Sequence, residues 1–146
     1  MAELPVDKST VIEYRLETVI EQEGEREVFL YEGKGKIVRM GEWLYLRYEE
    51  EHTNNKVTIK LSQAGKVTII RRSGEELASR MSFETAEKGS ALLPTPAGMM
   101  ELETNTKRLL QNYQDRPFSG TIQLDYTLGS NNQVLGNYGL SLQFTT

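Results

Sequence analysis

The sequence predicts an all-β protein, a single antiparallel up-and-down β-barrel of about 8–10 strands. Apolar side chains recur at every second residue along most of the chain, as in strands with one buried and one wet face. Turn-forming residues separate about ten such segments, and no stretch sustains a helical period. Closure into a barrel removes the sheet edges that such a meander would otherwise expose. A two-sheet sandwich is the alternative.

The clearest strand covers residues 11–22, where Ile12, Tyr14, Leu16, Thr18 and Ile20 share one face. The "SQAG" turn at 62–65 joins two further strands into a hairpin. Two glycines in 27–38 predict a bend or a bulge, and two prolines in 91–98 predict an edge strand or a bulged connection. The predicted strands are 11–22, 27–38, 42–51, 56–61, 66–72, 76–86, 91–98, 99–113, 120–129 and 137–144.

Length and composition indicate one domain over residues 1–146, and we expect residues 1–8 to form a loosely ordered N-terminal segment. The chain has no cysteine and a single histidine, His52, which argues against thiolate chemistry and histidine-based zinc sites. We expect no metal and no cofactor. No apolar run approaches the length of a membrane span, and the first residues contain no apolar segment of the kind found in signal peptides. We therefore expect a cytoplasmic protein with no membrane partner.

The charge is unevenly distributed along the chain. The net charge is −4, which argues against a general nucleic-acid-binding protein. Residues 52–80 nevertheless hold six Lys or Arg against two Glu. The basic outer face of residues 54–80 would suit a phosphate backbone or an acidic protein, as an interaction module. We find no exposed aromatic residues interleaved with these charges, so a solvated face is the favoured interpretation.

Two adjacent arginines end the strand 66–72, and the alternation of strand side chains places only one of them on the apolar face. One register of the hairpin sets Leu61 opposite Val67 and Val57 opposite Arg71, so that Arg71 continues the inward row. A slip by one residue would turn Arg72 inward instead. An inward arginine needs a partner, either a ligand carboxylate or phosphate, or an internal glutamate such as Glu49 or Glu50.

Three tyrosines also lie on apolar faces: Tyr14, Tyr126 and Tyr138. Their hydroxyls would hydrogen-bond a ligand, although a structural role in the core is the favoured alternative. Trp43 and Tyr45 alternate with leucines, so their strand is apolar on both faces and is a candidate surface for a homodimer.

A diffuse pattern of residues resembles the bacterial YwiB-like family of unknown function. It consists of Arg72-Ser73-Gly74, Phe83, Gly98, "ELETNTK" at 101–107 and "YLRYEEEH" at 45–52, and the similarity runs from about Val11 to Phe144. The resemblance implies a calycin or lipocalin-like β-barrel and favours Arg72 as the inward arginine. The family often has a tyrosine where this chain has Leu93, so a ligand role for that tyrosine is not carried over.

The residues favour a non-enzymatic protein that binds a small apolar or anionic molecule, with Arg71, Arg72, Tyr14, Tyr126 and Tyr138 as candidate ligand-binding residues. The alternatives are an interaction module that uses the basic outer face and, third, an enzyme without a recognisable motif. No catalytic triad, phosphate loop or metal-ligand spacing is present in the sequence.

Overall fold

The computed structural model describes residues 8–146, and they form a closed barrel of ten antiparallel strands. The predicted barrel is confirmed and the sandwich alternative is wrong. The predicted loose segment 1–8 lies outside the described residues except for Lys8. No helix within 8–146 is long and apolar enough to cross a membrane. The strands are β1 (Thr10–Gln22), β2 (Glu25–Met40), β3 (Trp43–Glu49), β4 (Lys56–Ser62), β5 (Lys66–Ser73), β6 (Glu76–Glu84), β7 (Lys88–Thr95), β8 (Gly98–Gln114), β9 (Ser119–Ser130) and β10 (Gln133–Thr145).

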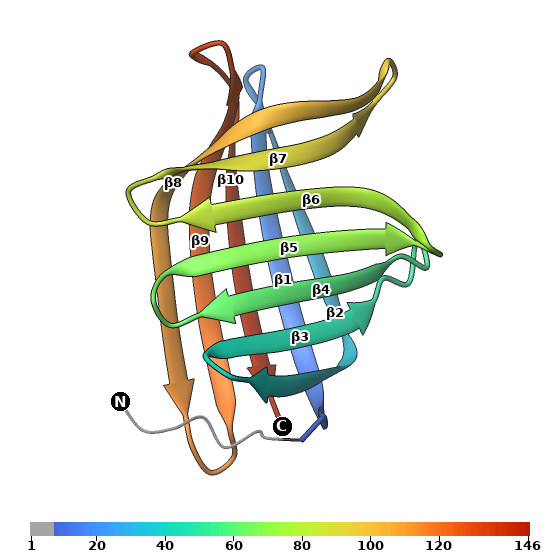
Figure 1. Cartoon of the computed structure of the whole chain (residues 1–146), viewed down its shortest axis with the longest axis vertical. Coiled ribbons are helices and arrows are strands. Elements are labelled where there is room, and N and C mark those ends of the chain that lie inside the picture. The colour runs from blue at the N-terminus through green and yellow to red at the C-terminus, as the bar shows by residue number, and fades with distance from the viewer. Residues whose placement is uncertain (1–7) are drawn as a thin grey trace.

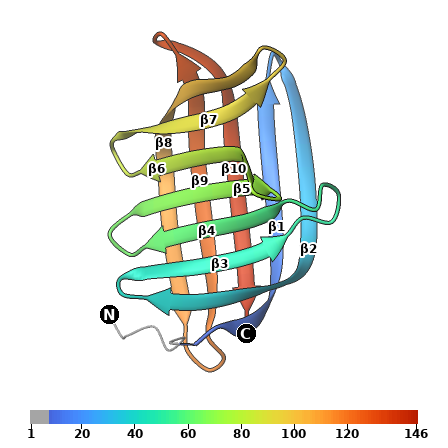
Figure 2. The same ribbon diagram turned by 45° about the vertical axis from the view of Figure 1, so that its right-hand side comes forward.

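Every strand pairs with its neighbour in sequence, and the first strand closes the barrel by pairing with the last. β1, β9 and β10 run along the long axis, whereas β3 to β6 cross in front of them (Figures 1 and 2). β2 and β8 are long enough to belong to both groups. β2 pairs with β1 from Glu25 to Ile37 but with β3 only from Gly35 to Met40. The first part of β2 therefore has a strand on one side only.

Tight turns set the registers. Gln22 pairs with Glu25, which leaves Glu23 and Gly24 as the turn, with φ values of 51° and 80°. Positive φ at both central residues defines the turn whose twist matches that of the flanking strands. The β1–β2 register runs unbroken through Gly33 and Gly35. Of the two expected distortions of this strand, the bulge is therefore wrong.

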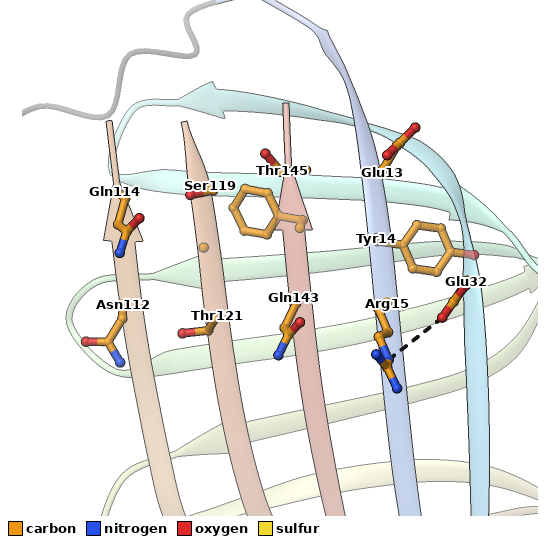
Figure 3. A pocket seen from close by; sticks show the side chains of 12 residues that line it. Glu13, Tyr14, Arg15, Glu32, Asn112, Gln114, Ser119, Thr121, Gln143 and Thr145 are labelled. Atoms are coloured by element: carbon orange, nitrogen blue, oxygen red, sulfur yellow. Dashed lines mark ion pairs between the residues drawn. The ribbon is translucent and has the colours of Figure 1, made fainter. Parts of the chain in front are cut away.

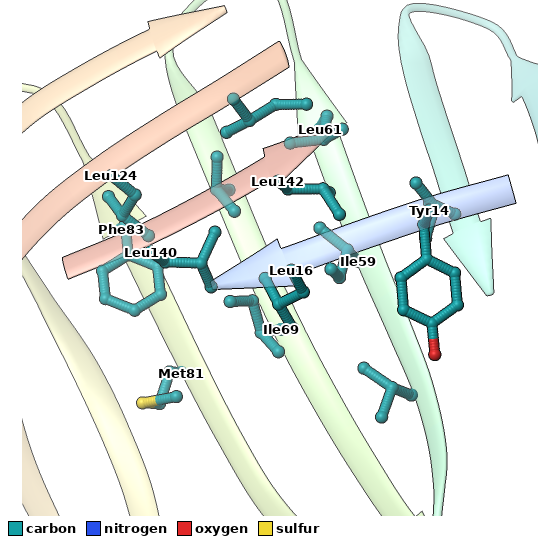
Figure 4. Packing of buried hydrophobic residues seen from close by; sticks show 14 of the residues in the cluster. Tyr14, Leu16, Ile59, Leu61, Ile69, Met81, Phe83, Leu124, Leu140 and Leu142 are labelled. Carbon is teal, nitrogen blue, oxygen red and sulfur yellow. The ribbon is translucent and has the colours of Figure 1, made fainter. Parts of the chain in front are cut away.

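Inward side chains fill most of the barrel. Each strand alternates, so Ile12, Tyr14 and Leu16 are buried on β1 while the residues between them are exposed. Leu16, Ile59, Ile69, Phe83 and Leu142 come from opposite walls and meet in the middle of the barrel (Figure 4). Burial of these side chains, each contributing roughly 1.5–3 kcal/mol, is the main favourable contribution to folding.

Aromatic rings close one end of the barrel. Phe118 lies 5.9 Å from Tyr113 and 5.6 Å from Phe144, measured between ring centroids. The Tyr113 hydroxyl donates a 2.6 Å hydrogen bond to Gln111, whose amide donates to the carbonyl oxygen of Ser62 on β4. Gln111 thus connects β8 to the end of β4, and this end of the interior is filled.

The pairing between neighbouring strands is shortest between β6 and β7. Only Arg80 with Leu92 and Met81 with Ala91 pair there, which agrees with the edge-like character predicted for residues 91–98. The Thr104 hydroxyl on β8 donates a 2.6 Å hydrogen bond to the Ser82 carbonyl on β6. Gly89 lies beside this hydrogen bond. A Cβ atom at Gly89 would lie 2.5 Å from the Thr104 Oγ1 and closer still to the Ser82 carbonyl oxygen. Gly89 is needed there because any side chain would separate β6 from β8.

Gly89→Ala should therefore lower the free energy of unfolding by about 2–3 kcal/mol, because backbone atoms must move to admit the methyl group. Gly139→Ala is the matched control, since its Cβ would meet only the flexible Asp125 carboxylate at 3.2 Å and the Val19 Cβ at 3.9 Å. Urea unfolding should place the control within about 1 kcal/mol of wild type. Equal stabilities for the two variants would contradict the tight packing proposed at Gly89.

Candidate functional site

The register of the β4–β5 hairpin decides which arginine faces inward. Leu61 pairs with Val67, Ile59 with Ile69 and Val57 with Arg71, as the alternation predicts. Arg71 therefore continues the inward row and is mostly buried, whereas Arg72 is exposed on the outside. The inward position that the family resemblance favours for Arg72 is wrong. The β5–β6 register shifts between Arg71 and Arg72, which marks a bulge there, and Arg71 remains on the inward side.

Arg71 has an internal partner. Its Nε lies 3.4 Å from a carboxylate oxygen of Glu50, and both side chains are about four-fifths buried, with relative exposures of 23% and 20%. Of the two partners considered for an inward arginine, the structure thus shows the internal glutamate. Glu50 lies just after β3, where the chain turns towards β4.

Two pairs of tyrosines lie in the same barrel interior. Tyr14 and Tyr48 pack with ring centroids 4.4 Å apart, and Tyr126 stacks on Tyr138 at 5.2 Å. The Arg71 charge lowers the pKa of both Tyr48 and Tyr126, against the larger effect of burial. Four of the five candidate residues therefore gather in the barrel interior, and Arg72 does not. Their role as ligand-binding residues stays a prediction.

Burial dominates the acid–base properties of these tyrosines. It raises the pKa of Tyr48 and Tyr126 well above the usual range, and the Arg71 charge offsets part of this increase. Burial also raises the pKa of Tyr14, and the negative charges of Glu51 and Glu50 raise it further. All three tyrosines are thus neutral hydrogen-bonding groups at physiological pH.

Two buried hydroxyls in the interior have no hydrogen-bond partner among residues 8–146. They belong to Tyr48 and to Thr106, which pairs with Tyr126 across β8 and β9. The Tyr126 hydroxyl has only a long contact of 3.8 Å with the Met81 sulfur. The Tyr138 hydroxyl, by contrast, is hydrogen-bonded to the Gln22 amide. A buried polar group without a partner is costly, so each of these hydroxyls favours an additional hydrogen-bonding group beside it.

The interior opens towards the β1–β2 and β9–β10 hairpins. On β1 the inward residues Ile12, Tyr14 and Leu16 are buried, but Thr18 and Ile20 are half-buried. On β2 the inward Ile37 is fully buried, whereas the inward Phe29 is 37% exposed. This gradient distinguishes an open end from the aromatic closure at the other end.

A small pocket lies at the rim, between β2 and the turn after β3. Its volume is about 100 Å³, and Tyr14, Tyr31, Tyr48, Glu50 and His52 are among its lining residues. The His52 ring packs edge-on against Tyr31 at 5.9 Å. A volume of this size admits a few water molecules or one small functional group, but not a whole organic ligand of usual size.

A shallow groove of about 450 Å³ lies on the outside of the barrel (Figure 3). Asn112, Thr121, Gln143, Arg15 and Glu32 form one outward row across β8, β9, β10, β1 and β2. Arg15 and Glu32 pair at 3.8 Å and are more than half exposed. Tyr14 and Phe144 also line the groove, but both rings are buried in the barrel core. The outward row itself has no buried polar side chain, and we therefore favour the barrel interior as the candidate site.

The candidate residues in the barrel interior could provide a ligand with hydrogen bonds, one charged group and apolar surface. Within residues 8–146 no three His, Cys, Asp or Glu side chains are close enough to hold a metal ion. The sequence interpretation missed Tyr48, Phe29 and Thr106. Tyr48 was detectable because it continues the alternation of Leu44 and Leu46. Alternation also puts Thr106 on the face of Leu102 and Thr104, but nothing in the sequence shows that its hydroxyl lacks a partner. The exposure of Phe29 carried no local signal, since it depends on where the barrel opens.

Arg71→Gln should lower the free energy of unfolding by about 1–3 kcal/mol, because it leaves the mostly buried Glu50 carboxylate without its cation. Arg72→Gln is the matched control and should change stability by less than about 0.5 kcal/mol, because Arg72 is exposed. Denaturant unfolding of both variants measures the difference. A larger effect at Arg72 than at Arg71 would reverse the assignment of the inward arginine.

Stability should decline at alkaline pH. Tyr14, Tyr48, Tyr113 and Tyr126 have a pKa that burial raises in the folded state, whereas an unfolded chain releases these protons near pH ~10. The contribution of these tyrosines to the free energy of unfolding is complete below that pH. It is lost as the pH rises towards their folded-state pKa, since the unfolded state then binds fewer protons than the folded state.

Urea unfolding across the alkaline range tests this pH dependence. Tyr126→Phe, which loses only the long contact to Met81, should show a weaker decline than wild type. An identical pH dependence for wild type and the variant would show that Tyr126 ionises normally in the folded protein.

Comparisons with known proteins agree with this architecture. The chain is 27% identical over 137 residues to the uncharacterized β-barrel protein YwiB of Bacillus subtilis (strain 168), covering 93% of this chain and 95% of that protein. It matches the crystal structure of the ywiB protein from Bacillus subtilis with a TM-score of 0.75 at 25% identity, over 94% of this chain and 92% of the other. A family model described as a domain of unknown function, DUF1934, matches residues 14–142. The chain therefore belongs to the DUF1934 family of YwiB-like β-barrel proteins, a family of unknown function.

Proposed function

We propose that this protein is a non-enzymatic barrel that binds a small molecule in its open end, in the manner of lipocalin-like barrels. The observation that carries the proposal is the exposure gradient of the inward rows. Phe29 is an inward aromatic that is 37% exposed, and Ile20 and Tyr138 are inward and half-buried. Apolar side chains that face a barrel interior and remain in contact with solvent form a surface suited to the apolar part of a ligand.

The polar part of the ligand is an anionic group. A carboxylate, sulfonate or phosphate would take the place of Glu50 beside the Arg71 guanidinium, whose planar set of donors matches such groups. The unpartnered hydroxyls of Tyr48 and Thr106 would supply further hydrogen bonds. Displacement of Glu50 costs part of the binding free energy, so we expect modest affinity. Tyr14, Tyr126 and Tyr138 would line the site.

Two dyes that differ by one charge test both parts of the proposal. 1-Anilinonaphthalene-8-sulfonate has an apolar body and a sulfonate, and N-phenyl-1-naphthylamine has the same body without it. Both dyes should bind saturably. Arg71→Gln should weaken binding of the sulfonate dye by at least about tenfold and leave binding of the neutral dye nearly unchanged. Arg72→Gln is the control and should affect neither.

Glu50→Gln should change the affinity for the sulfonate dye in the opposite direction. Because it frees the guanidinium, it should strengthen binding of the sulfonate dye, which a merely destabilised protein would not do selectively. Phe29→Ser should weaken both dyes, and cooperative unfolding confirms that each variant is folded. The proposal fails if neither dye saturates, or if Arg71→Gln and Arg72→Gln behave alike. Native mass spectrometry of the purified protein would show whether a molecule is retained.

A further inference from the structure

The outer side of β2 to β6 carries a group of cations. Lys36, Arg47 and Arg80 lie in one outward row that crosses these strands, with Thr58 and Ile70 between them. Lys60 lies in the next row, and Lys56 and Arg72 lie opposite each other in the row on the far side. We call the surface formed by these residues the basic face: Lys36, Arg47, Lys56, Lys60, Arg72 and Arg80. Five of these residues belong to β3 to β6, the strands that cross at the front of Figure 2, and Lys36 belongs to β2.

These six cations have no ion-pair partner among residues 8–146. The neighbouring Lys66 is paired with Glu84 at 3.8 Å, but the basic face itself has no such contact. Its one acidic neighbour in register is Glu49, opposite Lys56, and the two side chains form no ion pair. A concentration of unpaired positive charge on one face attracts a polyanion even when the whole chain is acidic.

Aromatic rings lie within this surface. Trp43 and Tyr45 point outward from β3 and are half-buried. The Lys60 Nζ lies 5.0 Å from the Trp43 ring and 5.5 Å from the Tyr45 ring, and the Arg47 guanidinium lies 5.5 Å from the Tyr45 ring. The sequence interpretation lacked interleaved aromatics because it considered residues 54–80 alone. The β3–β4 pairing supplies the rings from the adjacent strand.

We propose that the basic face binds single-stranded nucleic acid. Rings next to unpaired cations are the combination that such proteins use, because bases stack on the rings and cations contact the phosphates. The row from Lys36 to Arg80 spans four interstrand spacings, about 19 Å, which is enough for several nucleotides. A double helix keeps its bases stacked internally, so it would not use Trp43 and Tyr45.

Lys60 has a specific role in this arrangement. In the free protein its ammonium group lies over the two rings. A base that stacks on Trp43 or Tyr45 takes that position, and the long flexible side chain of Lys60 then turns to a phosphate. The cation–π contact is thus exchanged for an ion pair, and the stacking surface stays covered when no ligand is bound.

Trp43 is the sole tryptophan in the chain, so its fluorescence reports directly on this face. Unlabelled oligothymidylate and oligouridylate should quench it on stacking, and fluorescein-labelled versions should show saturable anisotropy at low salt. The logarithm of the association constant should fall with the logarithm of salt concentration, with a slope of about −0.7 per phosphate contact.

Matched variants separate charge from stacking. Lys60→Gln should flatten the salt slope by about 0.7, whereas Lys88→Gln, an exposed lysine on β7 that pairs with Glu103, should leave it unchanged. Tyr45→Leu should weaken binding about tenfold without changing the slope. Trp43→Leu should do the same when binding is followed by anisotropy.

Several results would overturn the proposal. These are absent binding at low salt, equal effects of Lys60→Gln and Lys88→Gln, or tighter binding of a duplex of the same length. Equal competition by polyglutamate would assign the face to acidic proteins, and concentration-dependent dimers that Trp43→Leu disrupts would assign it to a second copy. Dye binding at the open end does not involve this face, so either proposal can fail without the other.

Discussion

Pairing of the first strand with the last is the constraint on which the rest of the structure depends. Tyr14 pairs with Phe144 and Leu16 with Leu142, so closure aligns the inward rows of β1 and β10. Without this pairing both strands would be free edges and the core between them would be open to water. Because the paired residues are at opposite ends of the chain, closure is a contact of very high sequence separation. The ligand-binding proposal depends on it, since it holds Tyr138 beside Ile20.

The barrel separates three environments by the alternation of its strands. The middle of the interior is apolar and filled, one end is closed by aromatic rings, and the Arg71–Glu50 pair lies beside the rim pocket that Glu50 and Tyr48 line. Outward residues of the same strands form the basic face. Neighbouring residues therefore serve different surfaces: Arg71 points to the interior and Arg72 to the outside. A single residue of register shift would exchange the two surfaces.

Much of the fold was predictable because strand alternation and turn residues are local signals. The hairpin through residues 62–65 placed Arg71 correctly from the pairing of Val67 and Ile69 alone. The residues that carry the family resemblance are mostly turn and core residues, such as Gly74 and Phe83, and few of them lie in the candidate site. The partner of Arg71 was named only as one of two glutamates. Other features depend on strands that meet only after folding, so no local pattern encodes them. They are the open end, the hydrogen bond from Thr104 to Ser82, and the aromatic rings beside Lys60.

The unpaired side of β2 has a consequence for solubility. Val28, Phe29 and Leu30 are 50%, 37% and 50% exposed on a strand segment that lacks a second neighbour. Such a segment is a template on which other chains can add strands and begin a fibril. The charges on both sides of it, Arg26 and Glu27 before and Glu32 and Lys34 after, act as gatekeepers against that addition. The segment that borders the proposed ligand opening is thus also the place where the barrel must resist aggregation.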